Sequence, residues 1–387
     1  MPTLRGNWTF PTAIRFGAGR IAELPDACRA AGMKAPLLVT DRVLADLPMV
    51  GAAVDALRAA GLGAAVFSDV QGNPVGANVD AGVAALKAGG HDGVVAFGGG
   101  SALDVGKVVA FMAGQSRPIW DFEDIGDWWT RADAAGILPI VAVPTTAGTG
   151  SEVGRAGVIT REDTHTKKVI FHPKMMPAVT ICDPELTVGM PTAITIGTGM
   201  DALAHCLEAY CAPSYHPMAE GIAVEGLRLV NDALPRVAAD PTDIEGRSHM
   251  MSAAAMGSVA FQKGLGAIHA VSHPLGAIHD THHGMTNAVF MPYVLRLNRP
   301  AIEDKISRLA AFLGLEPSFD AYLAHILELR ANLGVPHTLA DLKPGIGDFE
   351  TMAAMAPHDP TAGGNPIEVT EAVALDLYQR ASEGRLD

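Results

Sequence analysis

The sequence predicts an α/β domain in residues 1–184, followed by an all-helical domain in residues 185–387. A chain of 387 residues is longer than one hydrophobic core usually serves, so two domains are expected. Short apolar runs alternate with helical patterns in the first part, whereas almost every pattern after Pro184 is helical. Because 49% of the residues are hydrophobic and only 18% are charged, the chain can bury a large core.

The first domain shows the alternation that is typical of parallel βαβ units. Its short apolar runs predict strands at 35–40, 63–70, 93–97 and 137–144. Helical patterns cover 50–61 and 77–90, and a further helix begins at about Ala102. Strands that alternate with helices of this length form a parallel sheet. The helical patterns of the second domain cover 192–210, 218–234, 246–261, 301–314, 321–334 and 369–381.

The formal net charge of −14 argues against several classes of partner. Lys and Arg form no basic run, so nucleic acid and anionic membranes are not expected to bind. No window reaches 18 uninterrupted apolar residues, and the first ten residues lack the apolar stretch of a signal peptide. Disulfides are not expected in a chain of this length, and a cytoplasmic protein is expected. The cysteines, which lack paired zinc-type spacing, are Cys28, Cys182, Cys206 and Cys211.

Two glycine-rich turns follow the third and fourth predicted strands. The first is Gly98-Gly99-Gly100-Ser101, and the second is PTTAGTGSE at residues 144–152. Glycine lets the backbone approach a pyrophosphate, and free N–H groups at a helix start favour negative charge. Such a turn can also be a tight connection without any ligand, and the first does not match GxGxxG. Two of them at the carboxyl ends of successive strands favour a nucleotide-binding crevice.

Asp41 stands at the end of the first predicted strand. A carboxylate at this place can accept hydrogen bonds from a ribose and would repel a 2′-phosphate, which favours NAD over NADP. The same residue can equally cap the following helix. The local sequence leaves both roles open.

Histidines and one carboxylate gather in two short segments of the helical domain. These segments contain Asp201, His205, His269, His273, His279, His282 and His283. Asp201 and His205 are spaced i, i+4, and so are His269 and His273, which places each pair on one helix face. One carboxylate with several imidazoles suits Fe, Zn, Co or Ni. A histidine pair can also simply face solvent, and the spacing does not choose among the last three histidines.

Together these motifs resemble the iron-containing (group III) alcohol dehydrogenase family. The similarity covers nearly the whole chain and is carried by FGGGSALDVGK, VPTTAGTGSE, CDPELTVGMP, TGMDALAHCLEAY, GAIHAVSHPLGAIHDTHHG and TAGGNP. The resemblance implies a dehydroquinate synthase-like fold with an NAD-binding α/β domain and a helical metal-binding domain. It also implies NAD and Fe²⁺ as cofactors, with Zn²⁺ or another divalent ion as an alternative.

The resemblance assigns roles to single residues. The metal ligands of the family match Asp201, His205, His269 and the histidine directly before Gly284, which is His283. His273 matches a catalytic histidine that lies beside the nicotinamide and the substrate. Positions that contact NAD in relatives match Asp41, Asn73, Gly99, Gly100, Ser101, Thr145, Thr146, Thr149 and Lys167.

The chain departs from the family pattern near the substrate positions. The segment Phe261-Gln262-Lys263-Gly264 is shorter than the Asn-Ala-containing segment of many relatives, and His279 stands where relatives often have Tyr. A Thr or Ser that is common near Gly154 is absent. Lys263 and His279 are therefore expected beside the substrate cavity. Lys263 suggests a carboxylate-bearing substrate such as an ω-hydroxy acid, although a lysine exposed to solvent is the favoured explanation.

The expected reaction interconverts a small primary alcohol, or a hydroxy acid, and its aldehyde. A divalent cation favours loss of the hydroxyl proton, NAD carries the hydride, and His273 relays the proton. The alternatives are a glycerol dehydrogenase-like polyol dehydrogenase, which typically has three protein ligands, and a non-catalytic nucleotide-binding sensor. A lyase of the dehydroquinate synthase type would need clustered Lys and Arg, and a Glu in place of Asp201.

The N-terminal segment NWTFPTAIRFG, residues 7–17, predicts an exposed hairpin or edge strand. An exposed edge invites pairing with another chain. Relatives dimerise through this region, so a homodimer or a higher homo-oligomer is expected.

Overall fold

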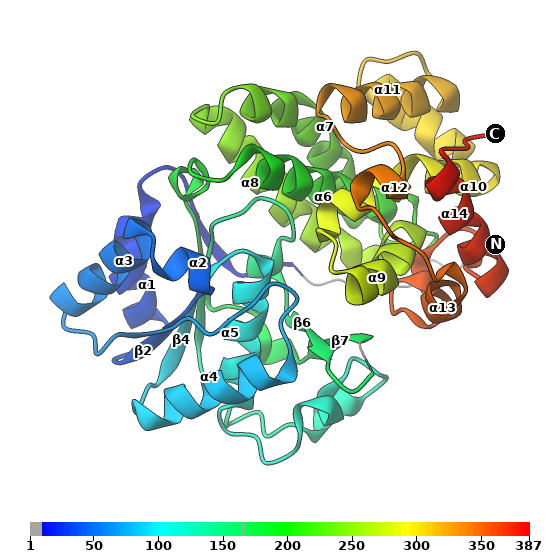
Figure 1. Ribbon diagram of the computed structural model, residues 1–387. Helices are drawn as coiled ribbons and strands as arrows, with labels where there is room; N and C mark the ends of the chain where they lie inside the picture. Colours follow the sequence, from blue (N-terminus) through cyan, green and yellow to red (C-terminus); the bar gives the residue numbers. More distant parts are fainter. Residues whose placement is uncertain (1–9, 165) are drawn as a thin grey trace. The chain divides into compact units, whose positions relative to one another are not determined.

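A six-stranded, fully parallel sheet forms the centre of the first unit of the chain, Phe10–Gly189 (Figure 1). Its strands, in spatial order, are β1 (Ala13–Phe16), β8 (Val179–Cys182), β5 (Ile140–Pro144), β4 (Gly93–Gly98), β2 (Pro36–Val39) and β3 (Ala65–Phe67). The computed structural model describes residues 10–164 and 166–387. The predicted parallel βαβ arrangement is confirmed.

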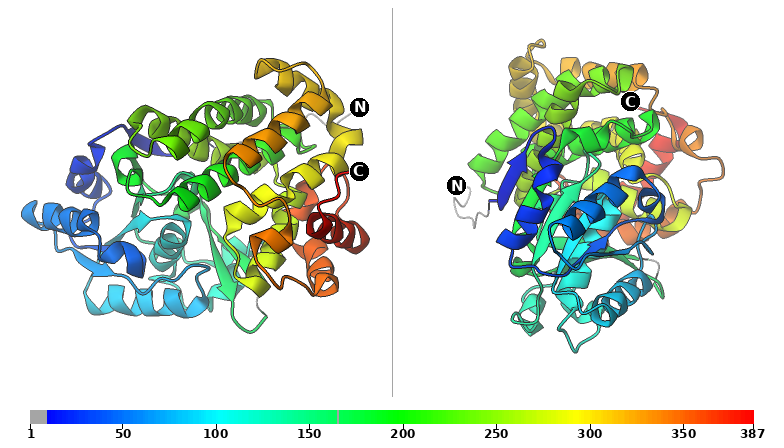
Figure 2. Two further views of the ribbon diagram at one scale, coloured as in Figure 1. Left: turned by 45° about the horizontal axis from the view of Figure 1, so that its top comes forward. Right: turned by 90° about the vertical axis from the view of Figure 1, so that its left-hand side faces the viewer.

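Both faces of this sheet are covered because both sets of alternating side chains are apolar. Leu37, Val94 and Ala96 face one hydrophobic cluster, which includes residues of α4 (Gly76–Ala88) and α5 (Gly100–Met112). The residues next to them in the strands face a second cluster with α1 (Leu24–Ala30) and α3 (Pro48–Ala59). Burial on two faces explains why the strands read as continuous apolar runs. The blue-to-green part of Figure 2 gives two further views of this unit.

Several elements of the α/β unit were not predicted. β8 is a four-residue strand, and β6 (Ala156–Arg161) and β7 (Thr166–Phe171) form a separate antiparallel hairpin. The predicted edge strand is found as β1, while residues 7–9 of that segment lie outside the described residues. The remaining short elements are α2 (Arg42–Ala45), η1 (Arg20–Glu23), η2 (Ile119–Phe122), η3 (Trp128–Arg131), η4 (Ser151–Val153), η5 (Pro173–Met175) and η6 (Pro184–Thr187).

The second unit, Met190–Asp387, contains only helices among its regular elements. They are α6 (Thr192–Cys211), α7 (Pro217–Ala239), α8 (Ile244–Ala260), α9 (Ala267–His279), α10 (His283–Phe312), α11 (Phe319–Asn332), α12 (Leu339–Leu342), α13 (Phe349–Met355) and α14 (Glu371–Glu383), with the short turns η7 (Phe261–Lys263), η8 (Ala356–His358) and η9 (Ala362–Gly364). The helical second half is confirmed.

Helix α6 is the central element of this unit and packs against α7, α8 and α10. All its residues from Gly199 to Cys211 are buried. Glycines allow the close approach: a Cβ on Gly199 would lie 2.4 Å from Leu234 of α7, and one on Gly226 would lie 2.6 Å from the Cys206 sulfur. The chain therefore presents the polar residues of α6 from a rigid, buried helix.

Among the helices that the structure describes, none combines the length and the apolar character that a membrane span requires.

Lys263 does not occupy the place that the sequence suggested. Its side chain is fully buried at the end of α6, where Nζ donates to the carbonyl oxygens of Ala209 (3.0 Å) and Tyr210 (3.2 Å) and also to that of Ala212. Nζ also pairs with Glu220 at 3.2 Å. Lys263 thus satisfies helix-terminal carbonyls that have no partner within the helix, and it is not exposed to solvent.

We expect Lys263→Met to destabilise the protein without changing substrate preference. The variant leaves buried carbonyl oxygens without a donor, which should lower the free energy of unfolding by about 1–3 kcal/mol. Denaturant titration measures this loss. The matched control is Lys87→Met, which replaces an exposed lysine in the last turn of α4 and should have an effect within about 0.5 kcal/mol. A selective rise in KM for an ω-hydroxy acid over the neutral alcohol of equal length, with stability unchanged, would contradict this role.

Candidate metal centre and nucleotide-binding loops

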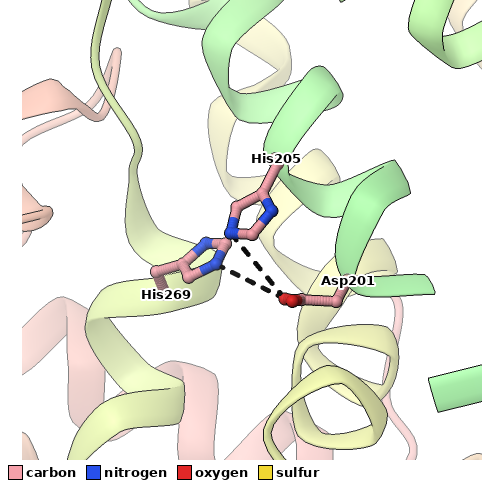
Figure 3. A group of neighbouring side chains, drawn as sticks. All are labelled: Asp201, His205 and His269. Carbon is pink, nitrogen blue, oxygen red and sulfur yellow. Dashed lines mark ion pairs between the residues drawn. The ribbon is translucent and has the colours of Figure 1, made fainter. Parts of the chain in front are cut away.

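Three side chains from two helices point toward one another in the helical unit (Figure 3). Asp201 and His205 lie on one face of α6, and His269 comes from the first turn of α9. One ligand atom of each lies within 4.8 Å of the other two, and Oδ1 of Asp201 is 3.9 Å from Nε2 of His205 and 3.7 Å from Nε2 of His269. The i, i+4 pair and a histidine from the second segment therefore meet at one point.

His283 reaches the same carboxylate from the start of α10. Its Nε2 lies 3.4 Å from Oδ1 of Asp201, and its ring lies 5.2 Å from that of His269 between centroids. Two glycines permit this approach, since a Cβ on Gly284 would lie only 2.0 Å from the carbonyl oxygen of Gly197 in α6. A side chain at Gly284 would push the first turn of α10, and His283 with it, away from α6.

The charges around Asp201 favour a cation. Burial by itself would raise the pKa of the Asp201 carboxyl, but the surrounding imidazoles bring this pKa far below its ordinary value. The pKa of His269 is raised to about 9 although burial opposes this, because the carboxylates of Glu208 and Asp201 flank its ring. Positive charge is therefore stabilised between these side chains.

Glu208 is a functional residue that the sequence reasoning missed. Its Oε2 lies 2.5 Å from Nδ1 of His269, and its Oε1 accepts the backbone N–H of Ile268 at 2.6 Å. A carboxylate on Nδ1 fixes the hydrogen there and leaves the Nε2 lone pair for a metal. The signal was present, because Asp201, His205 and Glu208 are spaced i, i+4, i+7 on one helix face.

Asn287, one turn after His283, was also missed. Its Nδ2 lies 2.8 Å from Oδ1 of Asp201 and 3.2 Å from Nε2 of both His269 and His283. Its Oδ1 is buried without a hydrogen-bond partner among the described residues. One carboxylate oxygen and two imidazole nitrogens thus converge on the amide nitrogen of Asn287, while its amide oxygen lacks a donor among the described residues. Both features, with a donor set of carboxylate and imidazoles, fit a divalent cation.

The other histidines of the cluster make different contacts. The ring of His273 stacks on that of His283, with centroids 5.2 Å apart and planes 18° apart, and its Nδ1 bonds to Asp359 at 2.8 Å. His282 caps α10 by accepting the N–H of Met285 at 3.3 Å. Nε2 of His279 lies 3.1 Å from the carbonyl oxygen of Gly347. The structure therefore gives His279 and His282 partners away from Asp201.

In the α/β unit the two glycine-rich turns lie against each other. β4 and β5 are neighbours, with Gly98 opposite Pro144, so the turns that follow them leave the sheet side by side. A Cβ on Gly99 would lie 3.2 Å from the Thr146 side chain, and one on Gly100 would lie 2.6 Å from that of Thr149. Glycine is therefore required here for the two turns to approach each other.

An ion pair with a buried lysine lies beneath these turns. Asp104 of α5 accepts the hydroxyl of Ser151, and Lys107 donates to the carbonyl oxygen of Ser151 at 3.0 Å and to that of Ala156. The two charged groups are 3.4 Å apart, and the Lys107 side chain is 1% exposed. Asp104 and Lys107 therefore tie the second turn to the helix that begins at the first.

The remaining predicted NAD contacts lie at the same edge of the sheet or on the hairpin. Asp41 follows β2, and its Oδ1 accepts the N–H groups of Val43 and Leu44 at 2.9 Å, so it caps α2. Asn73 follows β3 in a turn and has a positive φ of 49°. Lys167 is paired with Thr160 in the β6–β7 hairpin. The backbone N–H of Thr160 donates to the carbonyl oxygen of Pro74, the residue after Asn73, at 2.7 Å. The hairpin is thus attached to this turn.

Comparison with known proteins covers both units. Residues 11–184 match the family described as iron-containing alcohol dehydrogenase, and residues 195–382 match the C-terminal part of the Fe-containing alcohol dehydrogenase family. The chain is 38% identical over 372 residues to a 4-hydroxybutyrate dehydrogenase of Cupriavidus necator, covering 93% of this chain and 96% of that protein. It is 33% identical to an NAD-dependent methanol dehydrogenase of Bacillus methanolicus, covering 97% and 99%.

Solved structures agree with the sequence matches. The crystal structure of a 1,3-propanediol oxidoreductase gives a TM-score of 0.92 at 34% identity, covering 97% of this chain and 100% of that chain. The sulfoacetaldehyde reductase from Bifidobacterium kashiwanohense in complex with NAD+ gives 0.87 at 31% identity, covering 98% and 99%. The chain belongs to the iron-containing alcohol dehydrogenase family, and it is an NAD-linked alcohol oxidoreductase.

Proposed function

We propose that the protein interconverts a small primary alcohol, or a hydroxy acid, and its aldehyde at a divalent metal. Asp201, His205, His269 and His283 are the proposed ligands, and Fe²⁺ is the proposed ion, with Zn²⁺ or another divalent ion as an alternative. The observation that carries the proposal is the buried Asp201 carboxylate on which the imidazoles converge. When bound, the ion supplies positive charge that stabilises the charge developing on the substrate oxygen.

NAD is the proposed hydride carrier, and we assign its binding to the α/β unit. The glycine-rich turns offer backbone N–H groups at the start of α5 for the pyrophosphate. The proposed contacts are Asp41, Asn73, Gly99, Gly100, Ser101, Thr145, Thr146, Thr149 and Lys167. We propose residues 1–184 as the NAD-binding domain and residues 185–387 as the metal-binding and catalytic domain. The two compact units of the structure meet in the sequence between Gly189 and Met190.

His273 is the proposed catalytic residue. In alcohol oxidation the hydroxyl proton must leave, and a nearby imidazole can take it and pass it to solvent. The ring of His273 lies against that of His283, and 15% of its side chain remains exposed, which allows exchange with water. In the reverse direction the same imidazole returns the proton.

The substrate is proposed at the level of a class. Relatives are dehydrogenases of 4-hydroxybutyrate, methanol and 1,3-propanediol, which are small primary alcohols. Because Lys263 is bound at the end of α6, it does not supply the cation for a substrate carboxylate. One observation favours a glycerol dehydrogenase-like polyol dehydrogenase, which typically has three protein ligands. The group whose ligand atoms all lie within 4.8 Å of one another contains Asp201, His205 and His269, without His283.

We also propose a homodimer or a higher homo-oligomer in the cytoplasm. β1 lies at one edge of the sheet, and Phe10, Ile14 and Phe16 are about two-fifths exposed, at 42%, 39% and 38%. Unpaired strand edges with exposed apolar residues favour pairing with a second copy. All four cysteines are buried free thiols, which fits a reducing compartment.

Replacing any one of the four proposed ligands by Ala should lower the metal content after dialysis, and turnover should fall with it. The loss of affinity should exceed the roughly 10–100-fold that is typical of residues behind the ligands. NAD binding should largely survive, because the glycine-rich turns belong to the other unit. Elemental analysis beside NAD titration measures both properties.

The control variants are His273→Ala and His249→Ala. His273→Ala should keep the metal while kcat falls, and His249→Ala, at a partly exposed position of α8 beside Asp232, should change neither property. If His273→Ala loses the metal while His283→Ala keeps it, the ligand assignment is wrong. Full metal binding by His283→Ala alone would instead favour the three-ligand polyol dehydrogenase.

Asp41→Gly should raise the use of NADP relative to NAD, because the carboxylate that would repel the 2′-phosphate is gone. We expect the ratio of the two kcat/KM values to change by about fivefold or more, since one such contact contributes on the order of 1 kcal/mol or more. Asp41→Asn separates charge from capping, because Asn also caps helices well. Equal efficiency of the unmodified enzyme with both cofactors would show that Asp41 does not select NAD.

A proposed association through β1 predicts at least a dimeric mass by light scattering at micromolar concentration. Ile14→Lys places a charge on this exposed edge and should shift the equilibrium toward the monomer. Val66→Lys, at an exposed position of the opposite edge strand β3, is the matched control and should leave the mass unchanged. A monomeric mass for the unmodified protein would refute the proposal.

A further inference from the structure

Besides Asp201 and Glu208, a third carboxylate contacts the histidine cluster, from the C-terminal part of the chain. Asp359 directly follows η8, and its Oδ2 lies 2.8 Å from Nδ1 of His273. The Asp359 side chain is 7% exposed. Burial alone would raise the pKa of this carboxyl, but His273 and the hydrogen bonds from Thr361 lower it. Asp359 is therefore ionised and can only accept hydrogen bonds.

The two oxygens of Asp359 have different partners. Oδ1 accepts both the backbone N–H of Thr361 at 2.9 Å and its hydroxyl at 2.6 Å. Oδ2 is thereby directed to His273. Since an ionised carboxylate has no hydrogen to give, the hydrogen of this contact must be on Nδ1 of the imidazole.

The segment that carries Asp359 is attached to the start of α9, the helix of His273. Oδ1 of Asn365 accepts the N–H of Ala267 at 3.1 Å, and a Cβ on Gly266 would lie 2.7 Å from that oxygen. The segment that follows Asp359 is thus hydrogen-bonded to the beginning of the helix that carries His273. Both side chains of the His273–Asp359 pair are largely buried, at 15% and 7% exposure, so the contact is not one between flexible surface side chains.

We propose that Asp359 is the positioning residue of the reaction: it holds His273 with the hydrogen on Nδ1, so that Nε2 is free to receive the substrate proton. This inference rests on the proposed relay role of His273. In alcohol oxidation one proton moves from the substrate hydroxyl to Nε2, the imidazolium is stabilised by the Asp359 carboxylate, and Nε2 then releases the proton to water. Asp359 itself stays ionised throughout.

Asp359→Asn tests the proposal sharply because Thr361 decides how the new amide lies. The two donors of Thr361 should keep the amide oxygen, so the NH₂ group would face Nδ1 of His273 and donate to it. The imidazole would then carry its hydrogen on Nε2 and could not accept a proton there. We expect kcat to fall by about 10²–10⁴-fold, the usual contribution of a general base, with KM changed little.

Two readouts besides turnover separate positioning from damage to the structure. Metal content and the Kd for NAD should match those of the unmodified protein. In Zn²⁺-loaded full-length protein with ¹⁵N-labelled histidine, the His273 signal should show a hydrogen on Nδ1 in the unmodified protein and on Nε2 in Asp359→Asn. The His273→Ala spectrum assigns that signal.

A double-mutant cycle tests whether Asp359 acts through His273. Adding Asp359→Asn to His273→Ala should lower kcat no further than about twofold, because residues that act as one unit are not additive. The matched control is Asp341→Asn: this carboxylate also accepts from a threonine hydroxyl, that of Thr338 at 2.8 Å, but in the cap of α12. It should leave kcat unchanged.

The outcomes distinguish the inference from the proposed function. If His273→Ala turns over like the unmodified enzyme, the relay role fails and the inference fails with it. If His273→Ala is slow while Asp359→Asn is normal, only the role of Asp359 is overturned. Loss of metal or an unchanged histidine spectrum in Asp359→Asn, or a further multiplicative loss of kcat in the double variant, would make Asp359 a merely structural residue.

Discussion

The buried carboxylate of Asp201 is the group on which the arrangement of the helical unit depends. An ionised carboxylate that is 2% exposed needs opposite charge and hydrogen-bond donors close by, and the imidazoles of α6, α9 and α10 surround it. To bring these rings to one point, α10 must start in contact with α6, which Gly197 and Gly284 permit. Asn287 adds an amide donor at the same point. The imidazoles can therefore gather around Asp201 only because positions 197 and 284 are glycines.

Two imidazoles of this centre each have a carboxylate at Nδ1, but the two rings have different proposed roles. Glu208 holds Nδ1 of His269 and so turns its Nε2 toward Asp201, which is the orientation of a metal ligand. Asp359 holds Nδ1 of His273, whose ring stacks on the neighbouring histidine and keeps some exposure to water. A neutral imidazole has only one N–H hydrogen. A carboxylate that holds this hydrogen on Nδ1 therefore leaves Nε2 as the acceptor, for a metal ion or for a proton.

The α/β unit, to which we assign NAD binding, meets a different constraint, because a chain with a net charge of −14 has few cations to attract a phosphate. Backbone N–H groups at the start of α5 offer local positive potential without adding cations. This requires that the two turns lie close together and keep their shape. The lack of side chains at Gly99 and Gly100 allows the turns to lie close together, and the ion pair of Asp104 with the buried Lys107 keeps their shape.

The sequence by itself determined the parallel α/β first half, the helical second half, the two glycine-rich turns and the i, i+4 pairs, because periodicity and short spacing are local properties. It did not reveal the short strand β8. It misplaced Lys263, because the carbonyl of Ala212 that this lysine caps lies 51 residues away in the chain. Asp359 lies 86 residues from His273, and only the tertiary structure brings them together. Contacts between distant segments are decided by packing, and packing leaves no fixed spacing in the sequence.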